Sequence, residues 1–134
     1  MSAATIEEAI YTRATTGPTL NPIIGTRCYP VTFPEGGTYP ALAVQRISSP
    51  REHAMGTDPG IAHTRFQLTA ADTTRTGAQT LAAAVRADFA RWRGTIGTVV
   101  VQDTFVESQT DLPFDINVEL HLVPVDVIVH HGEV

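Results

Sequence analysis

The most regular spacing of hydrophobic residues in the chain lies between Thr76 and Gly94. Its apolar residues recur every three or four positions, as on one face of a helix: Ala78, Leu81, Ala82, Val85, Phe89 and Trp92. The opposite face is polar and includes Asp88. Thr76 has a glutamine three residues later, which is the spacing of a capping box, and glycine at position 94 favours a left-handed helix end. The pattern predicts a long central helix over 76–94.

A shorter pattern of the same kind lies near the N-terminus. Thr5 and Glu8 have the spacing of a second capping box, and Ile6, Ala9 and Ile10 fall on one side of a helix. These residues predict a short helix over 5–14. The stretch from there to position 40 is rich in glycine, proline and threonine, so no long element is predicted in it.

Alternating apolar and polar residues predict four strands, over 40–47, 62–70, 98–108 and 116–130. The second alternates most cleanly and places His63, Arg65 and Gln67 on one face, away from the core. We interpret this polar face as the candidate subunit interface.

In the fourth predicted strand the alternation changes phase at Val123–Pro124. An extra residue in a strand is normally absorbed by a bulge, and proline has no amide hydrogen for a ladder bond. We therefore expect a bulge or bend at this point, with Pro124 at an edge or in an unpaired position.

The predicted order is α-β-β-α-β-β in one domain over 1–134. Two hairpins around a long helix favour an α+β fold: an antiparallel four-stranded sheet with the long central helix and the short N-terminal helix packed on one face. The connection from Ser48 to Ile61 is longer than an ordinary hairpin turn, and loops of this length often carry function. Its mixture of charge, imidazole and thioether suits protein contact, so it is the candidate contact loop: Arg51, Glu52, His53, Met55 and Asp58.

The composition of the chain argues against several kinds of binding site. The 134 residues carry a net charge of −5, which argues against a general nucleic-acid-binding surface, and no apolar run is long enough to span a membrane. Cys28 is the only cysteine, so neither an intrachain disulfide nor a multi-cysteine metal site is possible, and we interpret it as a small buried apolar residue.

No motif for phosphate binding, a nucleophilic serine or a metal is present, and we expect no catalytic residue, cofactor or metal. One alternative, from another class of protein, stays open: a small α+β enzyme or ligand-binding domain with a cleft beside the central helix. It would require His63 or His121 to converge with Asp103. The two histidines fall on polar faces of predicted strands, where an exposed structural role is the ordinary explanation.

Several stretches occur in a distinctive order. They are the N-terminal amphipathic helix, GTRCYP at 25–30, Tyr39–Pro40 leading into VQRIS at 44–48, TRFQL at 64–68, and the central helix opened by 74–78. In this order and spacing the chain resembles the small tail-completion proteins of long-tailed phages and gene transfer agents. These proteins are also called tail terminators or head-to-tail joining proteins.

The resemblance implies a structural virion protein, not an enzyme, that is assembled in the host cytoplasm and has no membrane partner. Its subunits would form a homo-oligomer, usually a hexameric ring, that caps the tail tube and presents a docking face to the head connector. DNA would pass through without specific binding, and the candidate contact loop would face the lumen or the tail tube protein. The last strand lacks the aromatic and basic residues associated with the family's end. A head-completion or stopper protein on the head side of the joint is therefore the nearest alternative.

Overall fold

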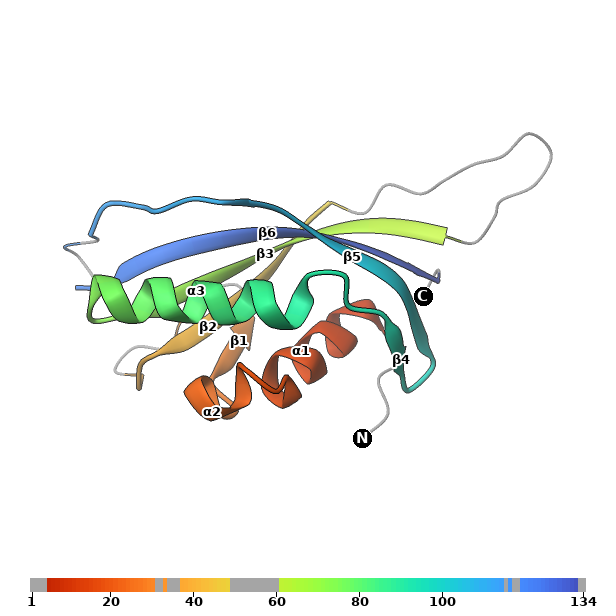
Figure 1. The fold of residues 1–134 in the computed structure, drawn as a ribbon, viewed down its shortest axis with the longest axis horizontal. Coiled ribbons are helices and arrows are strands. Elements are labelled where there is room, and N and C mark those ends of the chain that lie inside the picture. The colour runs from red at the N-terminus through yellow and green to blue at the C-terminus, as the bar shows by residue number, and fades with distance from the viewer. Residues whose placement is uncertain are drawn as a thin grey trace.

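The computed structural model describes residues 5–30, 33, 37–48, 61–114, 116 and 119–132. The elements in chain order are α1 (Ile6–Thr16), α2 (Asn21–Ile24), β1 (Cys28–Pro30), β2 (Ala41–Ser48), β3 (Ile61–Asp72), α3 (Arg75–Phe89), β4 (Gly94–Ile96), β5 (Val99–Gln109) and β6 (His121–Gly132). The sheet curls over the helices, which all lie on one of its faces (Figure 1).

The sheet corrects the fold expected from the sequence. It has six strands in the order β1-β2-β3-β6-β5-β4, and β1 runs parallel to β2 while the other neighbours are antiparallel. The predicted four-stranded antiparallel sheet is therefore wrong, and a third helix, α2, was also missed. The two extra strands have three residues each, too few for an alternating pattern to be recognised.

The α3 helix is present, but both predicted ends are wrong. Its N-cap is Thr74, whose hydroxyl accepts a 3.0 Å hydrogen bond from the amide of Gly77. At the other end the helix stops at Phe89, and Arg91 takes the left-handed conformation that was expected of Gly94. The Arg91 amide donates to the Thr104 carbonyl at 2.8 Å, so a bond to the sheet replaces a further helical turn.

The N-terminal helix starts as predicted. The hydroxyl of Thr5 accepts a hydrogen bond from the amide of Glu8, and the helix continues two residues beyond the predicted end to Thr16. The buried face of the helix consists of Ile6, Ala9, Ile10 and Ala14.

The last strand, β6, differs from the prediction in two ways. It begins at His121, because Glu119 has a positive φ of 56° that breaks the extended backbone before it. It also pairs with β3 without a register shift, and the irregularities lie in β2 and β5 instead. No bulge forms at Val123–Pro124. The Pro124 carbonyl accepts from the Thr110 amide just past the end of β5. Because the amide and carbonyl of a strand residue face the same neighbour, the amide hydrogen that proline lacks would point to this end of β5, so its absence costs no bond to β3.

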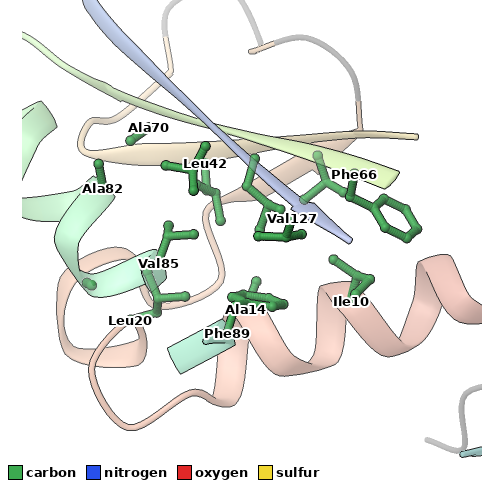
Figure 2. Packing of buried hydrophobic residues seen from close by; sticks show 14 of the residues in the cluster. Ile10, Ala14, Leu20, Leu42, Phe66, Ala70, Ala82, Val85, Phe89 and Val127 are labelled. Carbon is green, nitrogen blue, oxygen red and sulfur yellow. The ribbon is translucent and has the colours of Figure 1, made fainter. Parts of the chain in front are cut away.

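The core fills the space between the helices and the inner face of the sheet, the face that the helices cover. Figure 2 shows Val85 and Phe89 of α3 beside Ala14 and Leu20, with Val127 of β6 above them. Trp92 is half-buried at the end of α3 and packs edge-on against Phe89, with ring centroids 5.7 Å apart.

One carboxylate lies inside this apolar layer. Asp88 was expected on the polar face of the helix, but it is only 2% exposed. Its oxygens accept from the backbone amides of Thr19 and Leu20, the latter at 2.8 Å. Arg13 in turn donates two hydrogen bonds to the backbone carbonyl of Asp88, at 2.7 and 2.9 Å. This Asp88 clamp ties the turn between α1 and α2 to α3, and a side chain on Gly17 would collide with the carboxylate.

Candidate functional site and assembly surfaces

The outer face of the sheet, opposite the helices, carries the candidate subunit interface. Along β3 the inward positions Thr64, Phe66 and Leu68 are buried, so the alternate residues His63, Arg65 and Gln67 point outward, as the sequence predicted. The pairing register sets these three beside His130, Ile128 and Asp126 of β6.

Arg65 is the centre of a polar cluster on this face. Its guanidinium lies 2.6 Å from a carboxylate oxygen of Glu107 and 3.9 Å from one of Asp126. Asp126 also accepts hydrogen bonds from Gln67 at 3.3 Å and from Ser108 at 3.2 Å. These side chains are partly exposed, and their charges are already paired within the chain.

The next cluster along this face is aromatic. The rings of His63 and His130 stack with centroids 4.0 Å apart, and Phe105 meets His130 edge-on at 5.2 Å. The Arg91 guanidinium lies 4.8 Å from the centre of the Phe105 ring and 2.9 Å from a carboxylate oxygen of Asp103. Cation–π contacts of this kind cover an exposed ring without removing it from solvent contact.

Of the two histidines named for an enzyme site, His63 lies two strands from Asp103, about 10 Å away, with His130 between them, and His121 lies much farther away. His121 pairs with Asp72 at one end of β6, whereas Asp103 pairs with His130 at the other. Nine residues of strand separate the two, roughly 30 Å. Among the residues placed by the structure, no three histidine, cysteine or acidic side chains are grouped so that they could hold a metal.

One buried histidine, His131, had no predicted role. His131 is 2% exposed on the inner face, where Nδ1 lies 2.5 Å from the Gly132 carbonyl and Nε2 lies 2.6 Å from the Thr64 hydroxyl. A carbonyl only accepts, so Nδ1 carries the proton and Nε2 accepts from Thr64. Burial lowers the pKa of His131 and outweighs the bond to Gly132, which raises it.

Cys28 packs against the core from β1 and is partly exposed. Burial raises the pKa of its thiol to about 12. The thiol therefore stays protonated near neutral pH, which makes it a poor nucleophile and metal ligand.

Residues 8–128 match the family model of the tail completion protein gp17. The chain belongs to this family. A chain in the solved structure titled "Virion of native gene transfer agent (GTA) particle" has a similar fold, with a TM-score of 0.67 and 15% sequence identity over 98% of this chain and 97% of that one. A search of curated proteins finds no match.

Membership of the tail completion family confirms the resemblance read from the sequence, and it makes the protein a structural component of the virion tail. None of the helices that the structure describes is both long and apolar enough to cross a membrane. The candidate contact loop, with Arg51, Glu52, His53, Met55 and Asp58, lies outside the described residues.

One feature of the surface was not anticipated from the sequence. Three large apolar side chains that follow β5 are exposed: Leu112, Phe114 and Ile116. Ile116 was predicted to lie in the last strand, and the other two had no predicted role. The signal that could have identified them is the run of apolar residues at every second position, between acidic residues.

Proposed function

We propose that this tail completion protein forms a hexameric ring that caps the tail tube and joins it to the head connector. The observation that carries the proposal is the family match over residues 8–128. It is supported by the fold likeness to a chain of a gene transfer agent virion, which extends over nearly the whole of both chains.

The electrostatics are compatible with a ring that DNA crosses. A net charge of −5 leaves few cations to displace the counterions of DNA, so DNA would pass through without specific binding. The protein is not an enzyme in this proposal. The residues named for an enzyme site have other contacts, with His63 stacked on His130 and Asp103 paired with Arg91.

Within the ring, the candidate contact loop is proposed to meet the lumen or the tail tube protein. Its length and mixed composition favour contact with a protein surface. Deleting Arg51 to Asp58 should leave the ring intact and weaken its binding to purified tubes. Normal tube binding by the deletion variant would contradict this role.

The proposal is tested by measuring the mass of the purified protein over a range of concentrations, alone and with tail tubes, followed by negative-stain imaging. A hexamer has a mass of 6 × 14.4 = 86.4 kDa. We expect ring-shaped particles of this mass, or rings at the ends of tubes. A chain that stays monomeric and leaves the tube ends bare contradicts the proposal. Rings that bind the head connector and not the tube would instead place the protein on the head side of the joint.

A further inference from the structure

The exposed apolar residues after β5 form a ledge at one end of the molecule, defined by Leu112, Phe114 and Ile116, which are 37%, 46% and 78% exposed. The segment is held against the sheet by two backbone bonds, from Thr110 to the Pro124 carbonyl and from Leu112 to the Leu122 carbonyl. The Phe114 ring also packs against His121, with centroids 4.8 Å apart. Leu112 and Phe114 are therefore held in place while their apolar side chains remain open to solvent.

The ledge is also acidic. Residues 110–119 contain three acidic residues and no basic one. Asp111 lies 3.6 Å from the Arg75 guanidinium. Glu119 is exposed and has no ion-pair partner among the residues that the structure places. An apolar surface beside an unpaired carboxylate suits a partner that offers apolar side chains and a cation.

The opposite end of the same molecule offers both apolar side chains and a cation. We define it as the basic end: Arg91, Trp92, Arg93 and Val100, around the β4–β5 hairpin. Val100 is 49% exposed, Trp92 is half-buried, and residues 90–100 contain two arginines. Arg91 is paired with Asp103 at 2.9 Å, so Arg93 supplies the charge of this end. Arg93 is exposed and, within the described part of the chain, has no ion-pair partner. In Figure 1 the β4–β5 hairpin and the far end of β5 lie at opposite ends of the long axis.

We infer that the ledge of one copy docks on the basic end of a second copy, so that Phe114 and Leu112 cover Val100 and Glu119 approaches Arg93. This inference rests on the proposed ring. A contact between two different surfaces of identical subunits is heterologous, and it closes into a ring when the rotation per subunit divides a full turn. Two complementary patches at opposite ends of one chain are what such a contact requires.

Two variants test the contact. The ledge variant carries Leu112→Asp and Phe114→Asp, and the basic-end variant carries Arg93→Glu and Val100→Glu. All four side chains are exposed, so thermal melting should show that both variants remain folded. Arg86→Glu is the matched control, because it reverses an exposed charge on α3 that belongs to neither defined surface.

We expect each variant alone to be monomeric, the control to form rings, and an equal mixture of the two variants to form a heterodimer of 2 × 14.4 = 28.8 kDa. The mixture retains one intact ledge and one intact basic end, which allows one contact and no ring. Rings formed by either variant, or no heterodimer in the mixture, would overturn this contact while leaving the proposed ring in place. A wild-type chain that never associates, even on tubes, would overturn both.

Discussion

The helix layer beneath the sheet and the outer face of the sheet contain similar polar groups in different surroundings. In the helix layer, Asp88 of α3 is buried among apolar residues and accepts from the backbone amides of exposed Thr19 and buried Leu20. On the outer face, Asp126 accepts from Gln67 and Ser108 and lies near Arg65, but its side chain is still 26% exposed. Water can replace the partners of Asp126, but it cannot replace the carboxylate of Asp88 at the buried Leu20 amide. Polar contacts beneath the sheet should therefore determine stability, and those on the outer face should contribute little to it.

The largest expected effect is that of Asp88→Ala. It leaves the buried amide of Leu20 without an acceptor and removes the carboxylate that the Thr19 amide also contacts, and we expect a loss of about 3–5 kcal/mol in the free energy of unfolding. Urea denaturation followed by circular dichroism measures the change. Asp126→Ala is the matched substitution on the outer face, and it should cost less than about 1 kcal/mol. Equal losses in the two variants would contradict the contrast between the helix layer and the outer face.

The second effect concerns the buried pair of His131 and Thr64. His131→Val removes the acceptor of the Thr64 hydroxyl, which should cost about 1–3 kcal/mol at pH 8. Adding Thr64→Val removes the unsatisfied hydroxyl as well, so the double variant should recover part of this loss. A double variant as unstable as the sum of both single variants would contradict the assigned hydrogen bond.

The same pair predicts a pH dependence. Burial lowers the pKa of His131 in the folded chain below the value of about 6.5 that it has when unfolded, so the unfolded chain binds more protons between the two values. The stability contributed by His131 is therefore fully present above about pH 6.5 and falls as the pH decreases toward the folded pKa. Melting temperatures from pH 8 to 5 should decrease more for the wild type than for His131→Val. Parallel curves would show that His131 titrates alike in both states.

Thr74→Ala should come next in size, at about 1 kcal/mol, because it removes the side chain that caps α3. Thr76→Ala is the control, since Thr76 is the cap that the sequence predicted and it lies one residue inside the helix. Its loss should be only a few tenths of a kcal/mol. A larger effect at Thr76 than at Thr74 would restore the original assignment of the helix start.

These comparisons show which features the sequence could predict. The α3 helix and strands β2, β3 and β5 repeat their hydrophobic pattern over eight or more residues, so the elements themselves could be found. The N-cap of α3 could not be identified from the sequence, because Thr73, Thr74 and Thr76 are the same residue type and only the backbone conformation distinguishes them.

The edge strands and the buried polar groups were missed for a different reason. The β1 strand is defined by pairing with β2, and β4 by a tight hairpin with β5. Three residues carry no periodic signal of their own. Asp88 was placed on the polar face because carboxylates are seldom fully buried. What buries it is the turn between α1 and α2, about 70 positions away, whose amides need an acceptor.

The outward direction of His63, Arg65 and Gln67 could be predicted from the alternation in their own strand. Their partners on β5 and β6 could not, because the pattern within one strand does not determine the order of the strands in the sheet.

The smallest expected effect, that of Arg65→Ala, separates stability from assembly. The pair with Glu107 is short, but the two side chains are 34% and 42% exposed, so its loss should change the free energy of unfolding by less than about 1 kcal/mol. The predicted subunit interface at His63, Arg65 and Gln67 remains open to test by the same variant. If the outer face forms the contact between subunits, Arg65→Ala should lower the ring mass at micromolar concentration while leaving the melting temperature unchanged. If the ledge and the basic end form it, the mass should stay at that of the wild type, because the outer face then remains in solvent and its ion pairs serve only the subunit that contains them.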